Sequence, residues 1–190
     1  GGGYGYGIMG PSHHALNDLA LISGLDNIQG YVPACELDVL RSVLESLNTG
    51  PKYFRLGLNP NKIEKTFDYG FGSINISEEA KSTVVSLGPI AQEFLDIHKD
   101  FDHFSCFEFP FTEIPSSLEE SINKTKRLVV AEEHTQSGGL GEKIIAMLHE
   151  KNLEFNFMHR YANHYHGTFG DQNFHRIQNG LCKDSFAKIV

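Results

Sequence analysis

The sequence predicts an α/β fold with a mostly parallel sheet flanked by helices. Apolar segments of strand length alternate with amphipathic segments of helical spacing, and short turns link them. The alternation becomes regular at Ser82, so residues 82–190 are expected to form one domain. Residues 1–57 carry an earlier strand-and-helix pattern, and residues 58–81 are expected to connect the two parts.

In the first part, apolar spacing predicts a helix from Ser12 to Leu25 with Ser12 as its N-cap. A strand is expected around residues 28–32 and another at 52–56. Between them, Pro33 opens a second helix that Gly50 closes. One apolar stripe runs along this helix, made of Leu37, Leu40, Leu44 and Leu47. The connector is expected to carry one or two short strands between residues 67 and 76.

The second part alternates strands and helices in a regular order. Strands are predicted at residues 83–88, 104–109, 128–132 and 153–158. Helices are predicted at residues 89–99, 115–124, 139–150, 171–179 and 184–189.

Composition excludes several classes of partner. The net charge is −8, with 16 Lys and Arg against 24 Asp and Glu, so nucleic acid is not an expected partner. There is no run of about 18 apolar residues that would predict a membrane span, and Gly1 to Gly10 does not resemble a signal peptide. Three widely spaced cysteines without a CxxC motif favour reduced thiols and a cytoplasmic location.

The segment GPSHHALNDLAL, residues 10–21, is the first candidate site. Gly-Pro-Ser indicates a turn into a helix, whose N-terminal amides suit an anionic or oxyanionic ligand. Two neighbouring imidazoles on a helix point about 100° apart, so at most one of His13 and His14 is expected to face a given cleft. The alternative is that both are ordinary surface or capping residues.

Three further groups of residues are better explained without a ligand. The loop SGGLGE, residues 137–142, lacks the full dinucleotide fingerprint and is interpreted as a tight strand-to-helix turn. Glu132, Glu133 and His134 alternate faces at a strand end, so they are not expected to converge on one ion. The histidines His159, His164, His166 and His175 include an HxH pair that zinc could use. No third and fourth ligand is evident at a suitable spacing, so no metal site is predicted.

Four segments in register carry a family resemblance: GPSHHALNDLALISGL, NIQGYVPACELDVLRSVL, GPKYFRLG and RLVVAEEHTQSGGLGEKIIAML. Together they resemble the C-terminal section of the transketolase family over nearly all 190 residues. The resemblance implies that residues 1–57 are the end of the domain that holds the pyrimidine ring of thiamine diphosphate. Residues 82–190 then correspond to the transketolase C-terminal domain.

The resemblance also implies roles for single residues. His13 matches the family's active-site histidine, which reaches the hydroxyls of the substrate, and His14 stands beside it. Arg55 matches an arginine that helps to hold the sugar phosphate. Met9 stands where most transketolases have an aspartate that contacts a substrate hydroxyl. A thioether is a poor acceptor, so an unusual substrate, such as a nucleotide-linked or non-pentose sugar, becomes an alternative to the usual sugar phosphates.

By the same resemblance, thiamine diphosphate and Mg²⁺ are the expected cofactors, bound between the pyrimidine-binding domain and a partner, with the binding residues expected upstream of Gly1 and on that partner. The expected partner is an N-terminal diphosphate-binding subunit or domain, in a homodimer or heterotetramer, and the chain alone is expected to be inactive. The implied reaction moves a two-carbon ketol unit from a ketose to an aldose. Alternatives are a 1-deoxyxylulose-5-phosphate synthase, a 2-oxoacid dehydrogenase β-component, or a non-catalytic assembly module.

Overall fold

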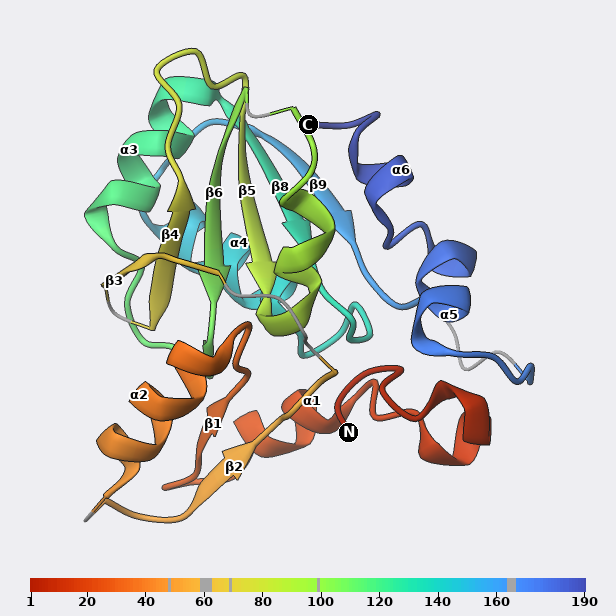
Figure 1. Cartoon of the computed structure of the whole chain (residues 1–190). Coiled ribbons are helices and arrows are strands. Elements are labelled where there is room, and N and C mark those ends of the chain that lie inside the picture. The colour runs from red at the N-terminus through yellow and green to blue at the C-terminus, as the bar shows by residue number, and fades with distance from the viewer. Residues whose placement is uncertain (48, 59–62, 69, 99, 164–166) are drawn as a thin grey trace.

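A six-stranded sheet forms the centre of the molecule (Figure 1). The computed structural model describes residues 1–190 except 48, 59–62, 69, 99 and 164–166. In spatial order the strands are β3 (Thr66–Asp68), β4 (Phe71–Asn75), β6 (Phe101–Cys106), β5 (Ser82–Leu87), β8 (Arg127–Ala131) and β9 (Asn156–Arg160). The pairs β6–β5, β5–β8 and β8–β9 are parallel, whereas β4 pairs antiparallel with β3 and β6. The mostly parallel α/β fold predicted from the sequence is confirmed.

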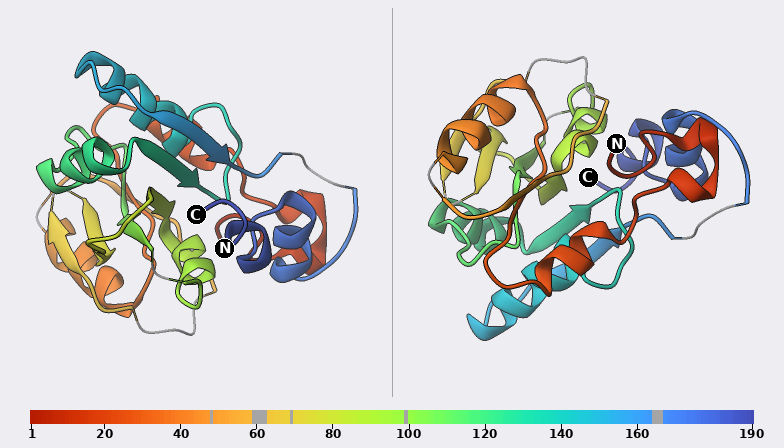
Figure 2. Two further views of the ribbon diagram at one scale, coloured as in Figure 1. Left: turned by 90° about the horizontal axis from the view of Figure 1, so that it is seen from above. Right: turned by 90° about the horizontal axis from the view of Figure 1, so that it is seen from below.

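Helices cover both faces of this sheet (Figure 2). Consecutive strand residues point to opposite faces, so Val85 packs toward α3 (Ser116–Thr125) and α4 (Leu140–Glu150). Its neighbour Val84 packs toward the 3₁₀ helix η3 (Gly88–Phe94) and toward α6 (Lys183–Phe186). Every residue of β5 and β6 is buried, including the polar residues of both strands, because both strands lie at the centre of the sheet with helices on each face.

The first part of the chain builds a smaller sheet beside the large one. Strand β1 (Gln29–Tyr31) pairs in parallel with β2 (Lys52–Phe54) and antiparallel with β7 (Glu108–Phe109). The helices of this part are α1 (Asp18–Ser23) and α2 (Glu36–Ser46). The predicted connector supplies β3 and β4, which are strands of the large sheet. Division of the chain into domains at residues 57 and 82 stays a prediction.

The crossover after β5 differs from its predicted form. The helix expected from Pro89 to about Lys99 is the 3₁₀ helix η3, which ends at Phe94. The next strand begins at Phe101, three residues earlier than predicted, so a shorter segment crosses to it. The helices predicted at Pro115, Gly139 and Asp171 are confirmed, the last as α5 (Gln172–Asn179) with Asp171 as its N-cap.

Helix α2 turns its apolar stripe outward. Leu37, Leu40, Leu44 and Leu47 are all between 47% and 59% exposed. The inward face carries Asp38 and Ser42, both fully buried. Asp38 accepts hydrogen bonds from the amide of Ala34 and from Lys65, each at 2.8 Å, and the side chains of this ion pair are completely buried. A polar contact to the connector therefore decides which face of α2 points inward.

Asp102 is not the solvated charge that its place beside Asp100 suggests. It is 1% exposed, near the start of β6 inside the large sheet. Its carboxylate accepts hydrogen bonds from the Ser77 amide at 2.8 Å and from the Ser121 hydroxyl at 2.7 Å. Lys124 forms an ion pair with it at 2.7 Å. Asp102 therefore ties β6, the segment after β4 and α3 together.

Breaking the buried pair of α2 should destabilise the fold. In Lys65→Met, the charge of Asp38 stays buried without its partner, which typically costs about 3–5 kcal/mol of unfolding free energy. Urea unfolding should show this loss, and a Lys65→Met/Asp38→Asn double variant should recover much of it. Lys81→Met, which breaks the exposed pair with Asp100, should cost less than about 1 kcal/mol. Equal losses for the two single variants would contradict the buried-pair interpretation.

Acid should destabilise the chain through His103. Burial, with a smaller contribution from Lys65, lowers the pKa of His103 from 6.5 to about 3. Between these values the unfolded chain binds a proton that the folded chain does not, so stability falls as pH falls below about 6.5. From pH 7 to 5 this group alone should remove about 2 kcal/mol of unfolding free energy. Urea titrations at both pH values should show a correspondingly weaker pH dependence in His103→Gln; an unchanged dependence would refute the assignment.

Candidate functional site

The segment around Gly-Pro-Ser-His-His is a pair of short 3₁₀ turns rather than the start of an α-helix. Turn η1 (Gly7–Met9) and turn η2 (Pro11–His13) meet at Gly10, whose φ is +80°. The chain then extends, and Ala15 exchanges backbone hydrogen bonds with Gly3 at 2.9 and 3.0 Å. Helix α1 begins only at Asp18. The predicted helix start at Ser12 is therefore wrong. The β-bridge between Gly3 and Ala15 requires an extended backbone at this point, so the helix cannot begin before it.

The turn η2 places the two neighbouring histidines in different environments. His13 is exposed at the end of η2, and its Nδ1 lies 3.0 Å from the hydroxyl of Ser12. His14 is 7% exposed and points into the molecule. The expectation that at most one of the two faces a cleft agrees with this arrangement. Met9 is 53% exposed on the preceding turn.

The ring of His14 lies in a cluster of three aromatic side chains. It meets Tyr4 edge-on at 5.0 Å and His175 of α5 edge-on at 4.6 Å, between ring centroids. Tyr4 and His175 are stacked at 4.8 Å. Tyr4 and His175 are fully buried. His14 thus anchors the turn that carries His13, because its ring packs against Tyr4 and against His175 from the C-terminal part of the chain.

Arg55 lies inside the molecule, 3% exposed, just after β2. Its Nε donates to the carboxylate of Asp18 at 2.9 Å. Its Nη2 donates to the carbonyl oxygens of Ala15 at 2.6 Å and Glu133 at 2.9 Å. Asp18 also accepts from the hydroxyl of Tyr53, and burial together with this contact raises the pKa of Tyr53 to about 12. The guanidinium thus joins the N-terminal segment to the end of β8, and contact with a substrate stays a prediction.

The glycine-rich loop before α4 is filled by the protein's own carboxylate. Glu132 is fully buried and accepts from the amides of Leu140 at 2.8 Å and Gly141 at 2.9 Å. His159 of β9 lies 2.6 Å from the same carboxylate. An added Cβ at Gly139 would lie 2.4 Å from Glu132, so the backbone must approach closely there. The interpretation of residues 137–142 as a structural turn is confirmed.

The acidic residues at the end of β8 point away from each other, as expected. Glu133 is 3% exposed and meets Arg176 of α5 at 3.0 Å. His134 is fully buried, its Nδ1 lies 2.8 Å from the carbonyl oxygen of Thr135, and burial lowers its pKa. Among the described residues, no group of three or more His, Cys, Asp or Glu side chains is arranged to hold a metal ion. His164 and His166 lie outside the described residues.

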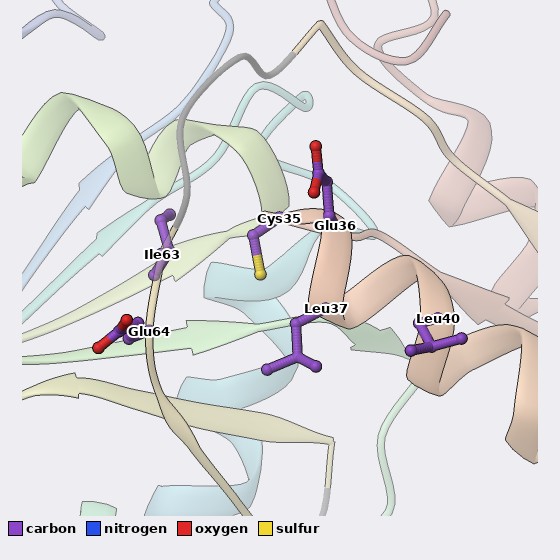
Figure 3. Close-up of a pocket in the computed structure, with 6 residues that line it drawn as sticks. All are labelled: Cys35, Glu36, Leu37, Leu40, Ile63 and Glu64. Carbon is purple, nitrogen blue, oxygen red and sulfur yellow. The ribbon is translucent and has the colours of Figure 1, made fainter.

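A groove of about 360 Å³ lies between α2 and residues 63–64 (Figure 3). Leu37 and Leu40 of α2, together with Cys35 and Ile63, provide its apolar lining. Glu36 and Glu64 bring two carboxylates to it. None of His13, His14 and Arg55 lines this groove. The predicted site residues therefore lie outside this groove.

Sequence reasoning misses the contribution of α5 to the candidate site. The sequence groups His175 with histidines that suggest metal binding, yet it contacts Tyr4, His14 and the carbonyl of Gly7. These partners are more than 160 residues away along the chain. A periodic pattern reports only local spacing, so no signal in one sequence indicates this contact.

Comparison with known proteins agrees with this architecture. Residues 110–173 match the family model described as "Transketolase, C-terminal domain". The chain is 24% identical to one of the subunits of the apulose-4-phosphate transketolase of Actinobacillus succinogenes, over 99% of this chain and 64% of that protein. It is also 24% identical to a 1-deoxy-D-xylulose-5-phosphate synthase of Desulfitobacterium hafniense, over 76% of this chain and 25% of that enzyme.

A solved structure extends the likeness to three dimensions. A split-gene transketolase, described as an inactive β4 tetramer, superimposes with a TM-score of 0.75 at 26% identity. The match covers 94% of this chain and 61% of that one, so the chain spans less than two thirds of the relatives it matches over nearly its whole length. The resemblance predicted from the sequence is confirmed: residues 110–173 match the transketolase C-terminal family model, and nearly the whole chain is similar to part of a transketolase subunit and of a split-gene transketolase.

Proposed function

We propose that this chain is the C-terminal component of a thiamine diphosphate-dependent transferase that moves a two-carbon ketol unit from a ketose to an aldose. The observation that carries the proposal is the presentation of His13. Its side chain is exposed at the tip of a turn, while the next residue anchors that turn in the core. The similarity to a transketolase subunit over 99% of the chain supports the same interpretation.

His13 is the residue proposed to act on the substrate. An imidazole carries nitrogens that can donate or accept a proton, so it suits proton transfer at a sugar hydroxyl or stabilisation of an oxyanion. The hydroxyl of Ser12, 3.0 Å from Nδ1, restrains the orientation of the ring. Met9, exposed on the adjoining turn, offers a thioether in place of a strong acceptor. The proposed donors therefore include nucleotide-linked and non-pentose sugars beside ordinary sugar phosphates.

The described residues do not fit the diphosphate and Mg²⁺ of the cofactor. They contain no cluster of metal ligands. The amides at the start of α4, which would suit a diphosphate, already bond to Glu132. We therefore propose that a partner polypeptide or domain brings the diphosphate and metal site, and that this chain is inactive alone. Bound thiamine diphosphate would supply the carbon nucleophile, and this chain would supply His13.

The outward face of α2 is the proposed contact with that partner. Four leucines at helical spacing are about half exposed on it, beside the groove of Figure 3. An apolar stripe of this kind on a surface helix usually marks an interaction site. We propose that it packs against the polypeptide that completes the enzyme, in a homodimer or a heterotetramer.

The proposed location is the cytoplasm. All three cysteines are free, and two of them, Cys35 and Cys106, are buried. Free thiols are the rule where the surroundings are reducing. Within the described part of the chain, no helix has the length and apolarity needed to cross a membrane.

Removing the imidazole of His13 should abolish most of the turnover. The longest natural form of the chain is combined with its partner, and ketol transfer is assayed with thiamine diphosphate and Mg²⁺. His13→Ala should lower kcat by about 10²–10⁴-fold, whereas His149→Ala, at an exposed histidine of α4, should leave it unchanged. Ketose phosphates and nucleotide-linked sugars are both offered as donors. Full activity of His13→Ala would refute the assigned role.

The same assay distinguishes the alternatives. Formation of 1-deoxyxylulose 5-phosphate in place of ketol transfer would favour a synthase, in line with the D. hafniense relative. Cofactor binding without cleavage of any ketose would indicate a changed chemistry linked to Met9. An assembly that binds no cofactor would leave only the role of an assembly module.

Charge on the outward face of α2 should weaken assembly. Leu40→Glu/Leu44→Glu alters side chains that are 56% and 58% exposed, so the chain should still fold. Burial of a leucine at an interface contributes on the order of 1.5 kcal/mol or more, so affinity for the partner should fall at least about tenfold per site. Sedimentation velocity of the mixed chains measures this. Ile76→Glu, at 59% exposure outside α2, is the control; equal affinity of both variants would place the interface elsewhere.

A further inference from the structure

Helix α5 lies against the N-terminal turns in space, although the two are at opposite ends of the chain. Figures 1 and 2 show the first residues beside α5 in every view. The packing is close at two points. An added Cβ at Gly7 would lie 2.5 Å from the ring of His175, and one at Gly10 would lie 2.5 Å from the ring of Phe169. The C-terminal segment thus touches the backbone on both sides of Met9.

His175 contacts this region in three ways. Its ring stacks on Tyr4, and it meets His14 edge-on. Its Nε2 lies 3.4 Å from the carbonyl oxygen of Gly7, so a proton on that nitrogen would point at the turn. His14 directly follows His13 in the chain. A shift of the His175 ring would therefore displace His14, the residue that follows His13.

Asn179, one turn further along α5, forms hydrogen bonds to two members of the aromatic cluster, Tyr4 and His175. Its Nδ2 donates to the hydroxyl of Tyr4 at 3.0 Å and to the carbonyl oxygen of His175 at 2.7 Å. Its Oδ1 accepts from the amide of Asn163 at 2.9 Å. One side chain therefore connects Tyr4, α5 and the segment after β9.

Helix α5 is itself fixed to the sheet. Arg176 donates to Glu133 at 3.0 Å and to Glu93 at 2.9 Å, and Gln172 donates to Glu133 at 2.9 Å. Burial opposes the charge of Arg176, but the two glutamates outweigh it and the net effect raises its pKa. Asp171 caps the helix through the amide of Phe174 at 2.7 Å. These contacts fix α5 to Glu133 after β8 and to Glu93 of η3, so α5 can serve as a support for the N-terminal turn.

We infer that α5 sets the position of His13, with His175 and Asn179 as positioning residues that act through His14 and Tyr4. The inference rests on the proposed function of His13. Reacting groups must be held within a fraction of an ångström, and misplacement by about 1 Å costs on the order of 10²-fold in rate. The C-terminal domain then contributes to catalysis without touching the substrate.

The test uses the assembled enzyme and two readouts, ketol transfer and amide hydrogen exchange of residues 7–14. His175→Ala and Asn179→Ala should each lower kcat by about tenfold or more with little change in KM. Both should speed exchange in the turn. His175→Phe keeps a ring in the stack and should recover part of the rate, while Tyr4→Phe, which removes one hydrogen bond, should have a smaller effect. Gln178→Ala, on the exposed side of α5, is the matched control.

A double variant separates positioning from general damage. If His175 acts through His13, then His175→Ala should lower kcat no further in a His13→Ala background. Additive losses, or unchanged rate and exchange in the single variants, would overturn the inference. If the wild-type assembly shows no ketol transfer, exchange alone decides: faster exchange in His175→Ala upholds the support of the turn while the proposed function fails, and unchanged exchange overturns the support.

Discussion

A buried carboxylate at the end of β8 organises the elements around the candidate site. Glu133 is almost fully buried, and a charge in such a place is tolerated only with a close partner. Its side chain bonds to Arg176 and Gln172 of α5, and its carbonyl oxygen accepts from Arg55. Helix α5 and the segment just after β2 must therefore both reach this residue. The N-terminal turn η1 packs against α5 next to this junction.

Much of the fold could be predicted from the sequence because local rules and tertiary packing agree there. The central strand β5 is buried on both faces, and its sequence STVVSL combines β-branched and small residues without any charge, which is typical of a strand. Pro115 and Gly139 mark the starts of α3 and α4 because they stand at the N-caps. The family resemblance rests on whole segments in register, which survive changes at single positions.

The remaining features depend on contacts that no local pattern contains. The stripe of α2 is visible in the sequence, but its outward direction follows from the pairing of Asp38 with Lys65, 27 residues away. Asp100 and Asp102 are alike in sequence, yet only Asp102 meets Ser121 and the Ser77 amide. Likewise, His13 and His14 are neighbours whose environments differ because Gly3 pairs with Ala15 and because His175 arrives from the other end of the chain.

The glycine-rich loop before α4 resembles a phosphate-binding loop in sequence but not in its contacts. Glycines at a helix N-terminus suggest a nucleotide, since phosphate oxygens and carboxylate oxygens seek the same amides. In this chain Glu132 already occupies them, and His159 lies 2.6 Å from the same carboxylate. The amides at the N-terminus of α4 therefore bind a carboxylate of the same chain in the folded state. The glycine loop of this chain is therefore closed to a nucleotide phosphate for as long as Glu132 keeps these two contacts.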